Sequence, residues 1–345
     1  MTSYGPHTQI DLSELDFFTQ APAQAPDREA ARFALELSAL SYDFRVEPWL
    51  AAGWTDISIQ ADERLMGGVA VADAAGRPLY QRVLNQWVPV AARRHISSRR
   101  VIRQVAGRVW KARPAQTGKA VTMIHPLPGG RYAVAIGFMG TGKRRMDWEV
   151  NFHFAHPEGF HAGFLAVTRQ FEDNCGKIRF DQTAAQLGLP RLTLADILAE
   201  ARRADSRFTL FAAGHSQGAA VLQLWLWRQM QQGLRPEHVQ GYGFAAPSVA
   251  AQDLPAYRQL PLTLLCSSDD AFARMGLRAH LGRAWHYRVD DAMRAFCYQG
   301  HETDPVFMQV LAHCNRFTGT KDALLFSISY LQAMARMPQE DARAS

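Results

Sequence analysis

The chain has 345 residues, of which 48% are hydrophobic and 20% are charged. This is the composition of a folded globular protein, and it excludes a largely disordered chain. The formal charge is +6 and the isoelectric point is near 9.3. The basic residues are scattered rather than gathered in one block, so we expect a solvated basic surface and no nucleic-acid partner.

The cysteines and the N-terminus give expectations about location. Cys175, Cys266, Cys297 and Cys314 form no C-x-x-C pair and no zinc spacing, and four cysteines in a chain of this length do not make a disulfide scaffold. A reducing compartment fits this pattern. The first residues lack a basic segment followed by an apolar run, and no apolar stretch is long enough to span a membrane. We therefore expect a non-transmembrane protein that is cytoplasmic, or exported without a Sec signal.

The N-terminal part is predicted to be an arm followed by a helix and short strands. Residues 1–26 contain three prolines among polar residues and read as an arm. Residues 27–42 have the apolar spacing of a helix, with Asp27 as its N-cap. Residues 54–121 read as short strands broken by turns, and the Ala-Gly-Arg-Pro sequence at 75–78 predicts a hairpin between the apolar runs on either side of it.

From residue 131 onward, strands alternate with helices. The sequence predicts strands at 131–139, 207–213, 239–245, 262–266 and 284–289, and helices at 192–204, 218–231 and 305–316. This alternation predicts an α/β fold with a mostly parallel central sheet flanked by helices. We divide the chain into an arm (1–26), an N-terminal helix and β-rich elaboration packed on the core (27–130), the core (131–335) and a C-terminal tail (336–345).

A G-x-S-x-G motif, Gly214-His-Ser216-Gln-Gly218, lies between the strand predicted at 207–213 and the following helix. A sharp strand-to-helix turn of this kind exposes a serine hydroxyl above the sheet, and the two glycines avoid collisions between the strand and the helix. The backbone N–H of Gln217 then points toward the position where an oxyanion would develop. Ser216 is therefore the candidate nucleophile.

A serine nucleophile needs a base and an orienting acid, which follow it in the order acid and then histidine. Asp269 and Asp270 come directly after the strand predicted at 262–266, and one of them is the candidate acid. His301 precedes the helix predicted at 305–316 and is the favoured base, ahead of His313 within that helix and then His280. His286 lies inside a predicted strand, where we expect it to pack against a sheet face.

Four segments resemble the class 3, fungal-type lipase-like branch of the α/β-hydrolases. G-H-S-Q-G-A-A at 214–220 resembles the family's G-H-S-L-G-G-A, and Gly140-Thr141 with Asp147-Trp148 resembles its F-R-G-T/S followed by D-W. H-A-G-F at 161–164 resembles its H-x-G-F, and D-D-A-F-A-R at 269–274 resembles its N-x-D-x-V-P-R. The resemblance spans about residues 130–290, with departures at Met139 and Ala273.

The resemblance implies an α/β-hydrolase fold and assigns several roles. Asp270 would be the acid, with Asp269 as the alternative. Thr141 would be a second oxyanion donor beside Gln217, and residues 142–157 would correspond to a lid. His280 matches a non-catalytic H-x-G segment of the family. The implied substrates are acylglycerols or other lipid esters, with transient contact at a lipid interface.

Two other patterns compete with this interpretation. Residues 137–143, G-F-M-G-T-G-K, nearly spell a phosphate-binding loop, but Arg144 stands where such a loop needs serine or threonine. His153, His156, Glu158 and His161 lie within nine residues, but their spacing matches no established zinc pattern. We expect a turn-rich surface segment there and no metal.

The sequence thus predicts a serine carboxylic-ester hydrolase of the lipase or esterase type, without a cofactor. Ser216, Asp270 and His301 would form its triad. Two alternatives remain: a non-catalytic binding protein that kept the hydrolase fold, and a nucleotide binder at residues 137–144. The pattern does not predict an oligomeric state.

Overall fold

The structure is a computed structural model. It describes residues 15, 18, 27–43, 46–58, 69–70, 75, 77, 79–83, 86–89, 120–141, 150–151, 153–155, 157–190, 192–267 and 276–287. Its α-helices are α1 (Arg28–Asp43), α2 (Glu47–Ala51), α5 (Ala162–Cys175), α6 (Asp181–Gln186), α7 (Leu194–Glu200) and α8 (Gln217–Gln231). Short 3₁₀ turns are η4 (Pro128–Gly130), η5 (Pro157–Gly159), η6 (Pro236–His238) and η7 (Pro255–Gln259).

Within the described residues, seven strands form one central sheet in the order β1-β5-β6-β8-β9-β10-β11. They are β1 (Thr55–Asp56), β5 (Ala120–Leu127), β6 (Arg131–Phe138), β8 (Phe208–His215), β9 (Val239–Phe244), β10 (Leu262–Ser267) and β11 (Arg283–Tyr287). The five strands from β6 to β11 are parallel, and β1 and β5 are antiparallel to their neighbours.

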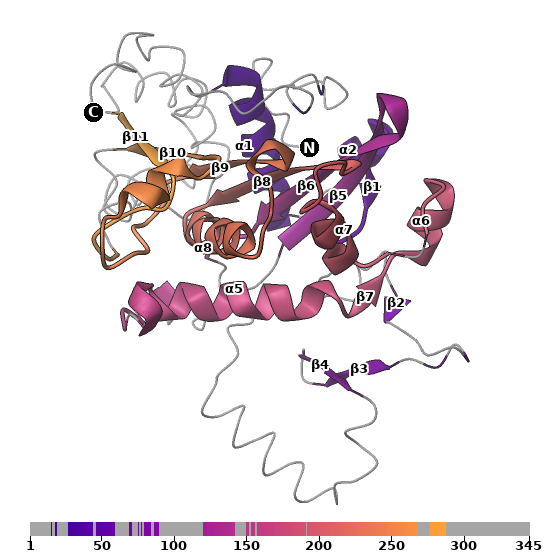
Figure 1. The fold of residues 1–345 in the computed structure, drawn as a ribbon, viewed down its shortest axis with the longest axis horizontal. Coiled ribbons are helices and arrows are strands. Elements are labelled where there is room, and N and C mark those ends of the chain that lie inside the picture. Colours follow the sequence, from indigo (N-terminus) through magenta and orange to yellow (C-terminus); the bar gives the residue numbers. More distant parts are fainter. Residues whose placement is uncertain are drawn as a thin grey trace, which may run out of the picture.

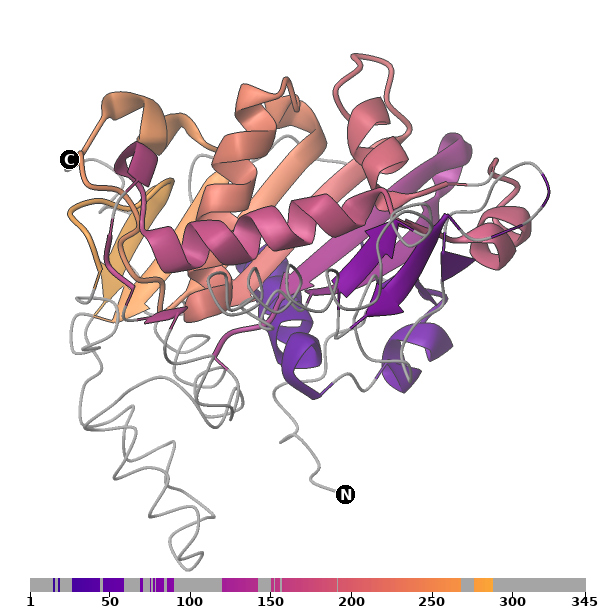
Figure 2. The same ribbon diagram turned by 90° about the horizontal axis from the view of Figure 1, so that it is seen from below.

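Helices cover both faces of this sheet (Figures 1 and 2). Alternate residues of β8 face opposite ways, because successive side chains in a strand point to opposite sides. Phe208, Leu210 and Ala212 pack toward α5, α7 and α8. Phe211 and Ala213 pack toward α1. This is the predicted mostly parallel sheet flanked by helices, and the α/β fold class is confirmed.

Aromatic side chains fill the layer between α1 and the sheet. Phe33 of α1 has ring contacts with Trp49, Trp54 and Phe211, at centroid distances of 5.1 to 5.6 Å. The hydroxyl of Tyr242 accepts a hydrogen bond of 2.9 Å from the backbone N–H of Asp27, the residue before α1. Burial raises the pKa of this hydroxyl well above its usual value. The N-terminal helix is therefore anchored to the middle of the sheet.

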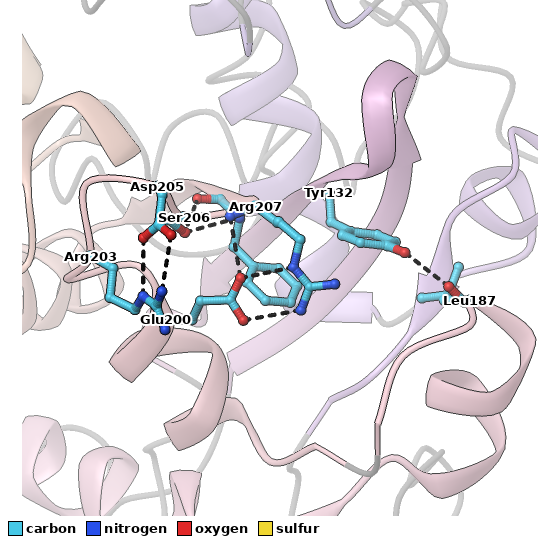
Figure 3. Close-up of polar contacts among 8 residues, drawn as sticks. Tyr132, Leu187, Glu200, Arg203, Asp205, Ser206 and Arg207 are labelled. Carbon is cyan, nitrogen blue, oxygen red and sulfur yellow. Dashed lines mark hydrogen bonds and ion pairs between the residues drawn. The ribbon is translucent and has the colours of Figure 1, made fainter.

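Polar contacts close the opposite end of β8, away from the motif serine (Figure 3). Arg207, just before β8, is paired with Glu200 at the end of α7, with an Nε–Oε1 distance of 3.1 Å. The Tyr132 hydroxyl of β6 donates to the Leu187 carbonyl at 2.9 Å. These contacts fix the connection from α7 into β8, while the exposed pair of Arg203 and Asp205 adds little.

The predicted hairpin across residues 75–78 is wrong. Strand β2 (Val69–Ala70) pairs with β7 (Ile178–Arg179), more than a hundred residues away. The hairpin instead joins β3 (Tyr80–Val83) to β4 (Gln86–Pro89), with two residues between them. Local turn signals do not determine which apolar runs pair, because a distant strand can compete for the same edge.

Other differences concern helices and the limits of the core. The sequence did not predict α5, and the helix predicted at 192–204 is shorter, at Leu194–Glu200. The helix predicted at 305–316 lies outside the described residues. Strand β5 belongs to the central sheet although it precedes residue 131, and the division of the chain into segments remains a prediction. None of the helices in the described ranges combines the length and apolar character that a membrane span needs.

Candidate functional site

Ser216 stands at the sharp turn between β8 and α8. Its backbone has φ 55° and ψ −121°, a conformation that a residue with a side chain rarely adopts. Its N–H donates to the Phe244 carbonyl at the end of β9, at 2.9 Å, and its own carbonyl accepts from Ala220 N at 3.1 Å. The turn is therefore held both by the neighbouring strand and by the first turn of α8.

The two motif glycines let the backbone segments at this turn approach closely. A Cβ atom on Gly214 would lie 2.5 Å from the carbonyl carbon of Gly218. A Cβ on Gly218 would lie 2.1 Å from the Phe138 carbonyl oxygen, at the end of β6. Any larger residue would push α8 away from β6. The glycines thus bring the start of α8 against the segment that leads to Thr141.

A small pocket lies beside Ser216. Its lining comes from the start of α8, the start of α5 and the loops around residues 151–154, 247 and 276. The lining residues are Asn151, Phe154, His161, Phe164, Ser216, Gln217, Pro247 and Gly276. Ser216 itself is only 4% exposed, so the serine is almost covered by its neighbours.

Thr141 follows the end of β6 on the same edge of the sheet as Ser216, since Phe138 of β6 is paired in register with Gly214 of β8. Its side chain is buried, and its Oγ1 accepts a hydrogen bond of 2.8 Å from Nδ2 of Asn151. Because Asn151 occupies an acceptor position of this oxygen, the Thr141 hydroxyl proton is not used in that contact. The Thr141 hydroxyl thus keeps its donor available.

His161 caps the start of α5 from a fully buried position. Its Nδ1 accepts from the N–H of Phe164 at 3.5 Å, and its ring is stacked on the Phe164 ring at a centroid distance of 4.0 Å. Burial lowers the pKa of His161 to about 4, and a hydrogen bond between its ring and the backbone of Asn151 opposes that lowering. The ring is therefore neutral near pH 7, and it forms part of the pocket wall.

The loop after β9 forms the opposite wall, and two polar side chains hold it. Gln223 of α8 donates from Nε2 to the Pro247 carbonyl at 3.0 Å, and its Oε1 accepts from Leu281 N at 2.9 Å. The His280 ring lies 2.8 Å from the Ala246 carbonyl through Nε2. Burial lowers the pKa of His280. Its ring thus contacts the backbone of this loop.

The other predicted partners of the serine have different outcomes. Asp269, Asp270, His301 and His313 lie outside the described residues, so their roles remain predictions. Strand β10, which precedes the two aspartates, is parallel to β8 and β9 and ends at the same edge of the sheet. His286 lies in β11, the last strand of the sheet order within the described residues, and its side chain is exposed rather than packed against a sheet face as we expected.

The residues of the two competing patterns have structural explanations. Gly137 lies inside β6, where an added Cβ would meet the Leu37 carbonyl of α1 at 2.6 Å, so close packing accounts for this glycine. Glu158 is paired with Arg169, and His161 is buried, whereas we expected a surface segment there. His156 lies outside the described residues. Within the described ranges, no three His, Cys, Asp or Glu side chains are grouped to hold a metal.

Comparisons with known proteins find likeness only among solved structures. No protein-family model and no curated protein matches the chain. A triacylglyceride lipase of Rhizomucor miehei is 18% identical with a TM-score of 0.35, covering 51% of this chain and 64% of the lipase. The propeptide complex of the Rhizomucor miehei lipase is 16% identical with a TM-score of 0.36, covering 73% and 64%.

A lipase from Rhizopus microsporus var. chinensis is 17% identical with a TM-score of 0.33, covering 50% of this chain and 58% of the lipase. In all three comparisons the matched part spans less than two thirds of the lipase. Because these values are low, an activity has to be inferred from the residues of this chain.

Sequence reasoning missed several residues of the pocket. None of the sequence motifs described above includes Asn151, Phe154, Pro247 or Gly276. Only tertiary packing brings these residues to Ser216. His161 had a signal in the H-A-G-F segment. Gly276 is close to Ser248, whose carbonyl an added Cβ would meet at 2.2 Å, and only the folded chain shows this contact.

Replacing Gly218 by alanine tests the close approach of α8 to β6. We expect Gly218→Ala to lower the free energy of unfolding by about 2–4 kcal/mol, because the new Cβ meets backbone that cannot move aside. Gly176→Ala is the matched control, since its Cβ would meet only Ala195 Cβ at 3.7 Å. Urea unfolding measures both. Equal midpoints for the two variants would contradict the packing argument.

The buried histidines predict a loss of stability in acid. Burial lowers the pKa of His215, like that of His161, to about 4. Between pH 6.5 and pH 4 the unfolded chain takes up protons that the folded chain excludes, so the free energy of unfolding falls as the pH falls. We expect His215→Gln to remove up to about 3 kcal/mol of this pH-dependent change.

Denaturant unfolding from pH 7 to pH 4 measures this effect. The exposed His153 provides a control, since His153→Gln should leave most of the pH dependence in place. If the His215→Gln protein keeps the wild-type slope, the buried neutral histidine does not account for the acid sensitivity.

Proposed function

We propose that the chain is a serine carboxylic-ester hydrolase of the lipase or esterase type that works through an acyl-enzyme. The strained backbone of Ser216, at the head of α8 and beside a pocket, carries this proposal. Backbone strain of this size persists only where surrounding contacts maintain it, and such positions are typical of functional sites. Acylglycerols or other lipid esters are the substrate class that the family resemblance suggests.

In the proposed reaction, Ser216 Oγ attacks the ester carbonyl carbon while a histidine accepts the hydroxyl proton. The resulting oxyanion accepts hydrogen bonds from the backbone N–H groups of Gln217 and Thr141. The intermediate collapses, and the histidine returns the proton to the departing alcohol. Water then attacks the acyl-enzyme in the same way, which releases the acid and restores the serine.

Two features support the assignment of the oxyanion donors. Gln217 is the first residue of a 15-residue helix, so its N–H has no acceptor within the helix and lies at the positive end of the helix dipole. The packing of Gly218 against the end of β6 keeps the 139–141 segment beside it. The Thr141 hydroxyl adds a third donor, because Asn151 donates to its oxygen and does not use its proton.

The remaining triad members are proposed from the sequence. Asp270, with Asp269 as the alternative, follows a strand that ends at the edge where Ser216 lies. His301, with His313 as the alternative, is the proposed base. The acid orients the imidazole and stabilises its positive charge when it holds the proton.

Removing the serine hydroxyl tests the proposed function. We expect Ser216→Ala to lower the hydrolysis of a short p-nitrophenyl ester at least a thousandfold, because no other group would form the acyl-enzyme. The matched control is Ser206→Ala at the opposite end of β8, which should keep wild-type turnover. Equal turnover in wild-type protein and Ser216→Ala would contradict the proposal.

Asn151 is proposed as a positioning residue for Thr141. We expect Asn151→Leu to lower kcat about tenfold with little change in KM, because the Thr141 donor contributes mainly to the transition state. Asn174→Leu, near the C-terminal end of α5, is the matched control and should not change either constant. A rise in KM with unchanged kcat in Asn151→Leu would show that Asn151 binds substrate instead.

A further inference from the structure

Two buried residues of the pocket carry polar side-chain atoms that have no hydrogen-bond partner. They are Oε1 and Nε2 of Gln217 and Oδ1 of Asn151. Gln217 is 1% exposed and Asn151 is 9% exposed. Each of the three atoms has less than 1 Å² of accessible surface. Among the described residues, these atoms therefore have neither a protein partner nor contact with bulk solvent.

This arrangement is costly for the folded chain. A buried donor or acceptor without a partner costs about 1–3 kcal/mol, and most buried polar atoms in proteins are paired. Elsewhere in the same helix, Gln223 is equally buried, but both of its amide atoms are bonded. Other buried polar atoms of the described residues also lack a partner, but those of Gln217 and Asn151 lie at one place, because both residues line the pocket that contains Ser216.

The three atoms offer both a donor and acceptors. Gln217 provides one of each, and Asn151 provides a second acceptor because its Nδ2 is bonded to Thr141. A hydroxyl group both donates and accepts, and it therefore matches this set better than an alkyl group does.

We propose that this pocket selects esters that carry a hydroxyl group within a few bonds of the scissile carbonyl, where the hydroxyl pairs with Gln217 and Asn151. This inference rests on the proposed ester hydrolysis. The pocket must widen to admit the ester, since its polar atoms are covered in this structure.

The rest of the lining agrees with such a ligand. Phe154, Phe164 and Pro247 supply apolar contacts for the carbon atoms of the ester. A ligand without a hydroxyl group would fill the pocket and leave the polar atoms of Gln217 unpaired. Sites that are built to bind a hydroxyl group reject analogues lacking it for this reason.

Three matched esters test the proposal with the wild-type full chain. Ethyl butyrate lacks a hydroxyl group, glyceryl 1-monobutyrate carries hydroxyl groups on the alcohol part, and ethyl 3-hydroxybutyrate carries one on the acyl part. We expect kcat/KM for at least one hydroxylated ester to exceed that for ethyl butyrate at least tenfold, and the preferred ester identifies the part that enters the pocket. Equal values for all three esters would overturn the inference.

Gln217→Leu tests the assigned residue. We expect it to reduce the preference for the hydroxylated ester roughly 3- to 10-fold, which is the loss of one neutral hydrogen bond. Gln231→Leu, on the exposed end of the same helix, should leave the preference unchanged. An unchanged preference in Gln217→Leu would remove this residue from the proposal and overturn it.

Thermal unfolding gives a second readout that does not require catalysis. Because Gln217→Leu removes two unpaired buried atoms, we expect its Tm to equal or exceed the wild-type value. A lowered Tm would show that the side chain supports the fold and would count against a binding role. If wild-type protein and Ser216→Ala hydrolyse all three esters at the same rate, the proposed function itself fails. If hydrolysis depends on Ser216 but shows no preference for a hydroxylated ester, only this inference is overturned.

Discussion

The close approach of α8 to the ends of β6 and β8 is the constraint on which the rest of the site depends. It requires that Gly218 have no side chain, since the Phe138 carbonyl occupies the place of a Cβ. The same approach forces Ser216 to a positive φ angle and directs the first N–H groups of α8 toward the pocket. The proposed nucleophile, the proposed oxyanion donors and the Thr141 segment thus depend on one packing contact.

Polar pairing differs between the supports of the site and its interior. Gln223, His280 and the Tyr242 hydroxyl are bonded to backbone groups that shape the loops and anchor α1. The pocket side of the site instead leaves the Gln217 amide unpaired. A protein that loses stability at a site in this way usually gains recognition there. The rigid supports then keep the unpaired groups in place for a ligand.

The sequence predicted the parts of the fold that depend on local patterns. Strand β8, the turn at Ser216 and helix α8 follow from an apolar run, two glycines and a helix-forming segment within 25 residues. It did not predict the pairing of Val69–Ala70 with Ile178–Arg179, because pairing between distant strands leaves no local signal. Asn151 was missed for the same reason, since its bond to Thr141 arises only when the chain folds. The histidine base stays a prediction because several histidines follow the serine.

Activity-based labelling tests the central claim most directly. We predict that a fluorophosphonate probe forms a covalent adduct on Ser216 of the native full chain. Mass spectrometry should locate this adduct on the peptide containing G-H-S-Q-G. Unfolding the protein before adding the probe should abolish the labelling. A native protein that stays unlabelled, or that carries the adduct on another residue, would contradict the account.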